Sequence, residues 1–389
     1  MNKILDSMSI LVLIILTFFI LSNNPKTVTH QHYPNDDSKN EVVVPSNNNN
    51  GGDQVKREWK ISQDGTVVHH GDHMILGRNY TININNSKKC NDLHNDTISF
   101  LIVILSSVGN FDRRQTIRET WALDLLQQLG NYRVIFMVGL TNSNEIQERL
   151  KFESLIHEDI VQINIQDNFY NLTHKSIHML FWYINYCSNA QFLFKTDDDI
   201  YLHIPNIIKW LKNVSTKNCN NTIFCRRNIS RKILRNANIK DLFLYSSFGK
   251  TNDKQLIERS RKKFQKYVVE YKQLPGNLYP EYCSGFGYAI SEMVAKKLFQ
   301  ASKTIPYIGI EDVFITGFCR YKMNITITDT ILLRLNPVIL PIESRCVFDT
   351  DRITSNELSN HDMKIMWTHV NTKGYYCKFS NITNMSNPV

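Results

Sequence analysis

Four apolar runs of strand length, separated by segments of helical length, constrain the fold of this chain more than any other feature. The runs are TISFLIVILSSV, YRVIFMVGL, DIVQINI and NAQFLFKTDDD, and they lie between residues 97 and 199. Their apolar residues would cover both faces of a strand, as in sheets that are buried on both sides. Helix-like segments separate them: RRQTIRETWALDLLQQLG, NEIQERLKFESLIHE and NLTHKSIHMLFWYINYC. We therefore expect an α/β fold with a mixed, mainly parallel sheet flanked by helices.

Three consecutive aspartates, Asp197, Asp198 and Asp199, end the fourth run. Side chains alternate in an extended segment, so Asp197 and Asp199 should face one way and Asp198 the other. Two carboxylates on one side can share a hard divalent cation such as Mn²⁺ or Mg²⁺, which proteins often hold together with phosphates. A polar loop or a helix cap would also account for three acidic residues. Because ligands of parallel sheets gather at the carboxyl ends of the strands, the position of the triplet favours a metal and phosphate site.

Two other pairs of charged residues carry chemical groups that such a site would use. Glu311 and Asp312 open a helix-like segment, where acids either complement the helix dipole or serve as a general base. Arg114 and Arg118 are four residues apart on one helical face. That spacing suits the binding of phosphate or carboxylate oxygens, but a solvated helix surface has the same spacing.

The segment CSGFGY contains Gly285 and Gly287, which would permit a bulge or the close approach of the backbone to a ligand. It lacks the third glycine and the preceding strand of a dinucleotide-binding fingerprint. We therefore exclude dinucleotide binding at this segment.

The N-terminal segment indicates a membrane anchor. Residues 8–21 form an uncharged apolar run, which would make about 21 Å of helix, short for a bilayer core of about 30 Å. Extension back to Ile4 gives about 27 Å. A cleaved signal peptide is the alternative, but no small-x-small cleavage site follows Leu21. The sequence thus predicts a cytoplasmic tail at residues 1–7, a signal anchor at 8–21, a partly disordered lumenal stem at 22–95 and a lumenal catalytic domain at 96–389.

Cysteines and glycosylation sequons support a lumenal address. The eight cysteines show no zinc-binding spacing, so disulfides are the simpler interpretation. Ten N-x-[ST] sequons are present, more than a cytosolic protein has reason to carry, although some are expected to be empty. They begin at Asn79, Asn85, Asn95, Asn171, Asn213, Asn220, Asn228, Asn324, Asn381 and Asn384.

Positive charge is concentrated in one segment. The chain has a formal charge of +9, and between Arg226 and Lys272 there are 14 Lys or Arg residues against 4 Asp or Glu, a net of +10. Nucleic-acid binding is the usual reading of a basic patch, but a lumenal location argues against it. We expect no nucleic-acid partner and instead an acidic acceptor or an anionic membrane surface at this segment.

Six motifs occur in one order across residues 100–367: RRQTIRETW, YNLTHKS, KTDDDIY, YPEYCSGFGYAIS, IEDVFITGFC and LSNHDMKIMW. Together they resemble the β1,3-galactosyltransferase family of inverting glycosyltransferases, which also includes N-acetylglucosaminyl- and N-acetylgalactosaminyltransferases. The resemblance implies a GT-A fold, a Rossmann-like arrangement that binds nucleotide sugars, and Golgi residence as a single-pass type II membrane protein. It also implies Mn²⁺-assisted transfer of galactose from UDP-galactose, in β1,3 linkage, to a glycan acceptor on glycoprotein or glycolipid.

The motifs also imply roles for individual residues. Asp199 resembles the family's principal metal ligand, with Asp197 and Asp198 facing the ribose, the metal's waters or the sugar. Asp312, beside Glu311, resembles the general base that deprotonates the acceptor hydroxyl. The implied donor-side residues further include Arg114, Arg118, Lys175, Gly285 and Gly287, and the implied acceptor-side residues are Tyr282 and Tyr288.

One departure from the family pattern concerns the metal, and two alternatives stay open for the function. Asn356 stands where the family commonly has a histidine that completes the metal's coordination. Asparagine is a weaker ligand, so His361 or His369 could take that place. A UDP-GlcNAc or UDP-GalNAc transferase would carry the same motifs. A catalytically inactive lumenal binding protein is the alternative of a different class, and the intact carboxylates argue against it.

Overall fold

The structure of this chain is a computed structural model that describes residues 59–69, 80–90, 97–214, 219–235, 264–330, 353–355 and 357–371. The chain divides into two units, residues 1–49 and 50–389, and every described residue belongs to the second. The predicted cytoplasmic tail and the anchor at residues 8–21 lie outside the described residues. Within the described ranges no helix is both long and apolar enough to cross a membrane.

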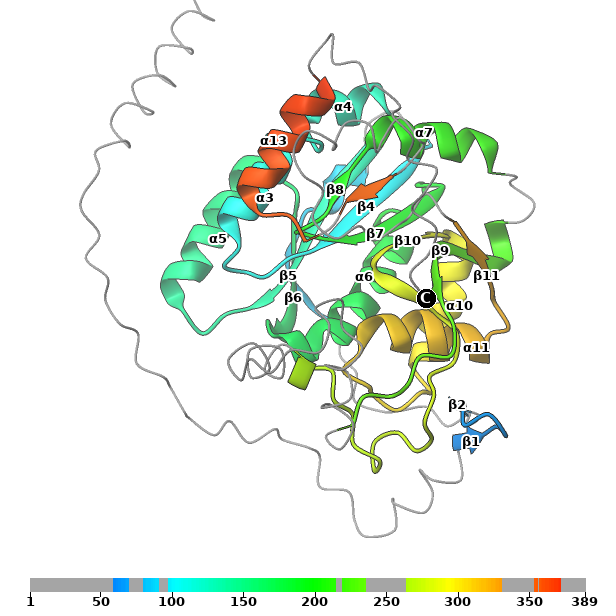
Figure 1. The fold of residues 1–389 in the computed structure, drawn as a ribbon. Coiled ribbons are helices and arrows are strands. Elements are labelled where there is room, and N and C mark those ends of the chain that lie inside the picture. Colours follow the sequence, from blue (N-terminus) through cyan, green and yellow to red (C-terminus); the bar gives the residue numbers. More distant parts are fainter. Residues whose placement is uncertain are drawn as a thin grey trace, which may run out of the picture. The chain divides into compact units, whose positions relative to one another are not determined.

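An eight-stranded mixed sheet forms the centre of the second unit, in the order β11-β9-β10-β7-β4-β5-β6-β3 (Figure 1). Four strands run parallel to one another: β4 (Phe100–Leu105), β5 (Tyr132–Leu140), β6 (Ile160–Gln166) and β7 (Phe192–Asp197). Antiparallel pairs add β10 (Tyr282–Ser291) beside β7 and β3 (Ile82–Asn85) beside β6. The remaining two, β9 (Thr222–Asn228) and β11 (Thr326–Asp329), pair parallel to each other beyond β10. The predicted α/β sheet is confirmed.

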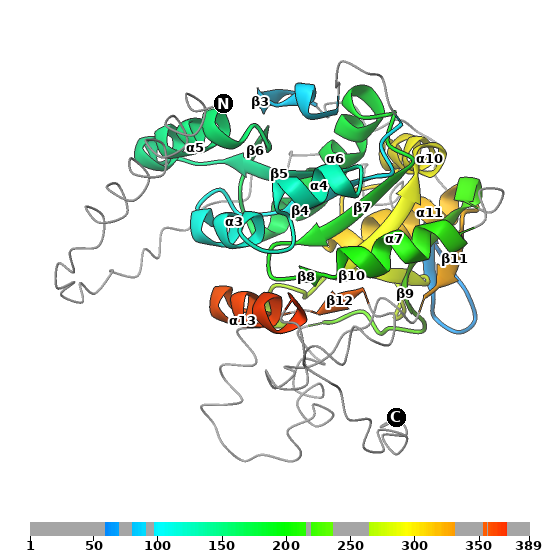
Figure 2. The same ribbon diagram turned by 90° about the horizontal axis from the view of Figure 1, so that it is seen from above.

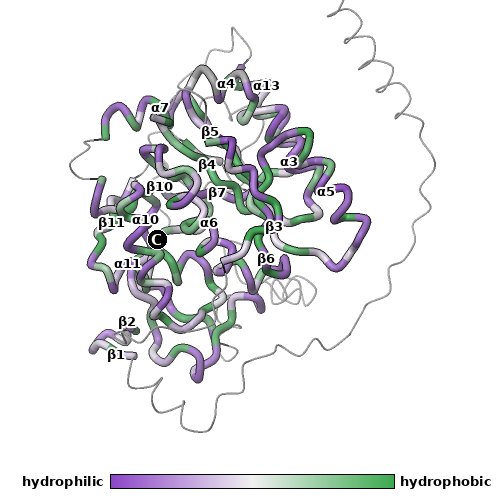
Figure 3. The backbone as a smooth tube through the Cα atoms, turned by 180° about the vertical axis from the view of Figure 1, so that it is seen from behind, coloured by the Kyte–Doolittle hydropathy of each residue, from purple (hydrophilic) through white to green (hydrophobic). Residues whose placement is uncertain are grey.

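Helices cover both faces of the sheet (Figure 2). One face carries α6 (Leu172–Tyr186), α10 (Glu292–Ser302) and the π-helix η5 (Val313–Cys319). The other carries α3 (Phe111–Arg118), α4 (Asp124–Leu129), α5 (Asn144–His157), α7 (Ile204–Asn213) and α13 (Asn360–Asn371). In β4, side chains alternate between the two cores, so every one of its six residues is buried. This burial on both faces explains why the parallel strands are continuous apolar runs in the sequence. Figure 3 shows hydrophobic segments concentrated in the middle of this unit.

The short strand β8 (Tyr201–Leu202) follows the aspartate triplet and pairs antiparallel with β12 (Thr354–Ser355). Two disulfides lie among the residues that the structure describes. Cys90 at the end of η1 (Ser87–Cys90) joins Cys187 after α6, and Cys225 of β9 joins Cys283 of β10. The disulfide interpretation is confirmed for these two pairs.

One detail refines the sequence prediction, and a second one corrects it. Part of the predicted stem is folded, because β3 is an edge strand of the sheet, while β1 (Trp59–Ile61) and β2 (Val67–His69) form a hairpin whose Trp59 and Val67 are buried. The predicted helix at residues 113–130 is interrupted between α3 and α4. Trp121, within the interruption, has no exposed surface, so burial of this indole outweighs continuous helical periodicity.

Candidate active site

The carboxyl ends of the parallel strands meet at one edge of the sheet, and the predicted acidic residues lie there. β7 ends at Asp197, and Leu105, the last residue of β4, pairs with it. Because β10 runs antiparallel to β7, with Gly287 opposite Thr196, its first residues pass the same edge. The sheet therefore brings Asp197 to the beginning of β10, although Tyr282 follows it by 85 residues in sequence.

The three aspartates have different surroundings. Asp198 points toward the loop after β4, where its Oδ2 accepts hydrogen bonds from Ser106 Oγ at 2.7 Å and Asn110 Nδ2 at 2.8 Å. Asp197 accepts instead from Lys195 Nζ at 2.8 Å. Burial, followed by the charges of Asp197 and Asp198, raises the pKa of Asp199 to about 6. Asp198 is thus a structural anchor, while the surroundings of Asp199 on balance disfavour its negative charge, although Arg113 opposes this.

Lys195 connects the triplet to the second acidic pair. Its side chain is fully buried, and Nζ donates to Asp197 and to the carbonyl oxygen of Gly285, and lies 3.4 Å from Glu311 Oε2. Burial alone disfavours the ammonium charge, but Asp197 and Glu311 outweigh burial and raise the pKa of Lys195. A permanent cation therefore holds β7, β10 and the segment before η5 together.

Asp312 caps the π-helix η5 and is held in place by two backbone amides. Its Oδ2 accepts from Gly285 N at 3.1 Å and its Oδ1 from Val313 N at 2.9 Å. A Cβ at Gly285 would lie 3.3 Å from Asp312 Oδ2, so a larger residue would crowd the carboxylate. Burial, followed by the charge of Glu311, raises the pKa of Asp312 to about 7, which suits a general base near neutral pH.

Glu311 faces the interior. Its Oε1 accepts from Ser176 Oγ at 2.8 Å and from Tyr288 OH at 3.3 Å, and the residue is 4% exposed. Burial raises its pKa, although Lys195 opposes this. The sequence could not rank the two acids. The structure separates them, because the half-buried Asp312 alone has surface that an acceptor could reach.

The π-helix itself is fixed to β10. Thr316 Oγ1 donates to the carbonyl oxygen of Asp312 at 2.6 Å and accepts from Cys283 N at 2.8 Å. Cys283 lies at an irregularity in the pairing of β10 with β9. π-Helical turns and strand bulges both concentrate at functional sites. Here Thr316 connects the π-helix to the irregular part of β10 through these two hydrogen bonds.

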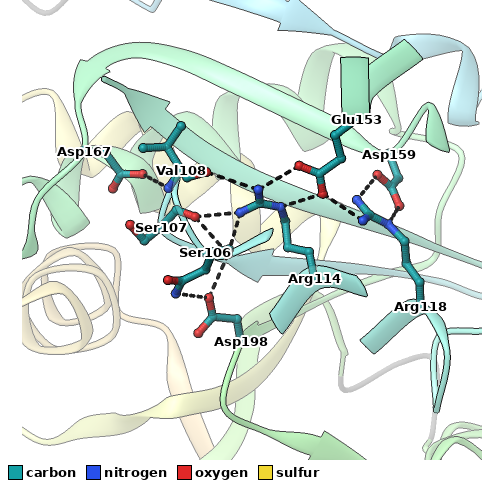
Figure 4. Close-up of polar contacts among 10 residues, drawn as sticks. Ser106, Ser107, Val108, Arg114, Arg118, Glu153, Asp159, Asp167 and Asp198 are labelled. Carbon is teal, nitrogen blue, oxygen red and sulfur yellow. Dashed lines mark hydrogen bonds and ion pairs between the residues drawn. The ribbon is translucent and has the colours of Figure 1, made fainter. Parts of the chain in front are cut away.

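Arg114 and Arg118 are committed to internal carboxylates (Figure 4). Arg114 has no exposed surface and forms two hydrogen bonds to Glu153, at 2.8 and 2.7 Å. Arg118 bonds Glu153 and, through two nitrogens, Asp159 at 2.8 Å. Arg114 also donates to the carbonyl of Ser107 at 2.6 Å. Arg114 thus supports the loop that anchors Asp198, and a direct contact of either arginine with a donor does not follow from its position.

Replacement of Glu153 by alanine should destabilise the protein by about 3–5 kcal/mol, because it leaves the buried Arg114 without a carboxylate. Glu148→Ala on the same helix is the matched control, since Glu148 and its partner Lys151 are exposed and such pairs contribute at most about 1 kcal/mol. Urea unfolding of both variants measures the difference. Equal, small losses of stability would contradict a supporting role for the arginine cluster.

Lys175 is also an internal ligand of the loops at this edge. Its Nζ donates to Asp167 Oδ1 at 2.7 Å and to the Ser106 carbonyl at 2.8 Å, and burial lowers its pKa. Asp167 Oδ2 accepts from Val108 N at 2.7 Å and from Gly139 N at 3.0 Å. A Cβ on Gly139 would lie 2.6 Å from the Ile165 carbonyl oxygen, so only glycine allows this contact. Lys175 thus orders the loop after β4, and a direct donor contact does not follow from its position.

The remaining predicted site residues also differ in whether their side chains are accessible. Tyr288 is fully buried, so a direct acceptor contact does not follow from its position, whereas Tyr282 is half-buried at the start of β10. A Cβ added at Gly287 would make only ordinary van der Waals contact with Phe194. Asn356 lies outside the described residues. Its described neighbour Leu358 donates from its amide to the Asp199 carbonyl at 3.0 Å. The alternatives His361 and His369 lie on α13.

The described carboxylates fit a hard divalent cation whose other coordinating atoms come from a bound phosphate group and water. No group of three or more His, Cys, Asp or Glu side chains in the described ranges is arranged as a complete metal site. Asp199 and Asp197 supply two carboxylates. Burial, followed by the charges of Asp197 and Asp198, raises the pKa of Asp199, and a bound cation would favour its charged form. Mg²⁺ and similar ions commonly take one or two carboxylates and complete their shell with water and phosphate oxygens.

Several residues of this site escaped the sequence prediction. Lys195 precedes the triplet by two residues, so strand alternation could have placed it on the face of Asp197. Ser106, Asn110 and Ser176 contact the acids across long sequence separations and had no local signal. Tyr267 is a further residue that the charges of this site affect. Burial raises its pKa, and the charges of Asp312 and Asp197 add to this effect.

Comparison with known proteins identifies the family. The Galactosyltransferase family matches residues 112–330, more than half of the chain, and this chain belongs to that family. The family predicted from the six motifs is therefore confirmed.

Two human relatives illustrate the similarity. Lactosylceramide 1,3-N-acetyl-beta-D-glucosaminyltransferase of Homo sapiens is 31% identical over 264 residues, which cover 66% of this chain and 62% of the relative. Beta-1,3-galactosyltransferase 5 of Homo sapiens is 29% identical over 248 residues, which cover 63% of this chain and 69% of the relative.

A fish relative and a solved structure are two further matches. Lactosylceramide 1,3-N-acetyl-beta-D-glucosaminyltransferase B of Danio rerio is 32% identical and matched over 60% of its length, so the chain spans about three-fifths of this relative and of the first human one. A solved glycosyltransferase involved in glycosylation of the major capsid of PBCV-1 is 9% identical, with a TM-score of 0.32 and coverage of 68% of this chain and 98% of that one.

Proposed function

We propose that this protein is an inverting glycosyltransferase that moves a hexose from a UDP-sugar to a hydroxyl of a glycan acceptor. The observation that carries the proposal is the placement of Asp312 next to the triplet, linked to Asp197 through Lys195 and Gly285. Donor-binding carboxylates and a base with a pKa of about 7 at one sheet edge are the groups that such a transfer needs. A protein that only binds glycans has no use for this combination.

The reaction is a single displacement. Asp312 takes the proton of the acceptor hydroxyl, whose oxygen bonds the anomeric carbon of the donor sugar while the bond from that carbon to the UDP oxygen breaks. Attack opposite the leaving group converts an α-linked donor into a β-linked product. The amides of Gly285 and Val313 hold the Asp312 carboxylate in one orientation, so little reorganisation accompanies proton transfer.

Asp199 and Asp197 are the residues that would hold Mn²⁺ or Mg²⁺. The ion would neutralise the negative charge that develops on the departing diphosphate. Lys195 fixes one oxygen of Asp197 and leaves the other for the ion. A third protein ligand at Asn356, or at His361 or His369 in its place, is part of this proposal.

The donor that we propose is UDP-galactose, transferred in β1,3 linkage to glycoprotein or glycolipid glycans. UDP-GlcNAc is the second candidate, because two of the relatives described above are named for transfer of N-acetylglucosamine to lactosylceramide. UDP-GalNAc shares the scaffold implied by the motifs. We also propose the Golgi membrane as the location, with residues 8–21 as a type II anchor and the catalytic unit in the lumen.

An acidic acceptor or anionic surface at the segment between Arg226 and Lys272 remains part of the proposal. Residues 236–263 of this segment lie outside the described ranges. Arg235 is buried and donates to the carbonyl oxygens of Leu274 and Gly276, whereas the exposed Arg226 lies 3.2 Å from Asp329. An anionic partner would therefore bind basic residues other than Arg235.

A donor panel tests the proposed function. The full chain, purified in detergent with Mn²⁺, is given each common UDP-sugar in turn with simple galactosides and N-acetylglucosaminides as acceptors, and UDP release is measured. We expect acceptor-dependent release from UDP-galactose. Release from UDP-GlcNAc alone would select the second donor. Absence of release with every donor, together with absence of Mn²⁺ binding by calorimetry, would favour the inactive binding protein.

A further inference from the structure

Six of the ten glycosylation sequons fall on described asparagines, and the sheet sorts them by edge. Four lie at the amino edge, opposite the active site, and two lie at the carboxyl edge beside it. The amino-edge group is Asn85, Asn213, Asn220 and Asn324, and the carboxyl-edge group is Asn171 and Asn228.

The register of the strands places the amino-edge group. Asn85 ends β3 and pairs with Val161 at the start of β6. Asn220 lies two residues before β9, and Asn324 lies two residues before β11, the parallel partner of β9. Their loops touch, because Asn221 Nδ2 donates to the Asn324 carbonyl at 3.1 Å. Figure 2 shows β3 and β11 at opposite ends of the sheet.

Asn213 reaches the same edge through α7. Three residues before it, the indole of Trp210 lies 6.3 Å from the ring of Phe192, the first residue of β7, and 5.2 Å from that of Phe224. All four amino-edge asparagines are exposed. At Asn85, the amide oxygen accepts from Trp182 Nε1 at 2.9 Å, which leaves the nitrogen for a sugar.

The carboxyl-edge asparagines are half-buried and use their amide nitrogens within the fold. Asn171 Nδ2 donates to the Gln166 carbonyl at 2.8 Å, and Thr173, the third residue of its sequon, is fully buried. Asn228 Nδ2 donates to Ser284 Oγ at 2.8 Å. Ser284 directly precedes Gly285, so a glycan on Asn228 would project beside Asp312.

We propose that the mature protein carries N-linked glycans at the exposed amino-edge asparagines and none at Asn171 and Asn228. The inference rests on the lumenal placement proposed above. In the modification, the side-chain nitrogen loses a proton and bonds the anomeric carbon of an oligosaccharide, while the lipid diphosphate that carried the oligosaccharide leaves. This transfer precedes folding, so the folded structure decides which glycosylated chains can reach the native state.

The proposed pattern has two consequences for the fold. Bulky, hydrophilic glycans at Asn85 and Asn324 would shield β3 and β11, the outer strands of the sheet among the described residues, from pairing with another chain. The carboxyl edge, over which donor and acceptor must enter, stays free of carbohydrate.

Peptide mass spectrometry tests the pattern on the full chain made in a eukaryotic secretory host. Enzymatic removal of the glycans in heavy-oxygen water converts each modified asparagine to labelled aspartate. We expect label on the amino-edge group and at least about tenfold less at Asn171 and Asn228. Equal labelling of the two groups would overturn the proposal while leaving the lumenal placement intact. No label at any sequon would overturn both, whereas the donor panel reports separately on transferase activity.

Two variants distinguish a lost glycan from a lost side chain. Ser87→Ala removes the sequon of Asn85 but retains its hydrogen bond to Trp182. Thr326→Val removes the sequon of Asn324 and keeps the asparagine itself. This matters because the φ of 50° at Asn324 suits asparagine better than most residues. Each variant should lose one glycan by mass and keep its turnover. An unchanged glycan mass in both would contradict modification at the two edge strands.

Discussion

Asp312→Asn should lower transfer by about 10²–10⁴-fold, the usual contribution of a positioned general base. An amide cannot accept the proton of the acceptor hydroxyl, but it occupies the same space beside Gly285. One of the two backbone amides that bond Asp312 would lose its acceptor, at a cost of about 1 kcal/mol, so the variant should stay folded. Calorimetry should show UDP binding close to that of the unchanged protein, and a turnover assay measures the loss.

The pH dependence gives a second readout of the same residue. The pKa of Asp312 is raised to about 7 by burial and by Glu311, and the base must be deprotonated to act. The kcat/KM of the unchanged protein should therefore rise with pH through about 7 and fall roughly tenfold per pH unit below that value. A flat profile between pH 5 and pH 8, or near-normal turnover of Asp312→Asn, would exclude Asp312 as the base.

Asp199→Ala should abolish the stimulation of turnover by Mn²⁺ and lower the rate by about 10²–10³-fold, since stabilisation of the leaving group by a cation contributes several kcal/mol. The fold should be retained, because removal of one of three crowded carboxylates relieves repulsion. Titration of activity against Mn²⁺ concentration measures the effect.

Asp198→Asn is the matched control for the metal. The side chain of Asp198 bonds Ser106 and Asn110, away from Asp197. Its replacement should lower stability through the weaker hydrogen bonds and leave the response to Mn²⁺ in place. A Mn²⁺ response that disappears in Asp198→Asn but survives in Asp199→Ala would reverse the assignment of the metal ligand.

The parallel core of the fold could be predicted from the sequence for a simple reason. Each residue of β4 is buried on one face or the other, so the strand appears as a continuous apolar run. The edge strand β3 alternates between half-buried and exposed residues and follows a polar segment, so it had no comparable signal. The interruption between α3 and α4 depends on the burial of Trp121, which local periodicity cannot show.

The candidate site was predicted in part. The position of Asp197 and Asp199 at the carboxyl edge of the sheet could be predicted from the apolar run before them, and the family motifs singled out Asp312. The arginine pair could not be assigned from spacing alone, since its partners Glu153 and Asp159 lie 39 and 41 residues away. Local sequence could not predict the interior position of Glu311 either, because its hydrogen-bond partners Ser176 and Tyr288 belong to other elements.

The configuration of the transferred sugar tests the central claim most directly. Proton NMR of the product, recorded as the full chain consumes an α-linked UDP-hexose, reports the anomeric configuration of the new bond. Single displacement with Asp312 as the base predicts a β-linked product from the first turnover. An α-linked product, or hydrolysis of the donor without transfer to any acceptor, would contradict it.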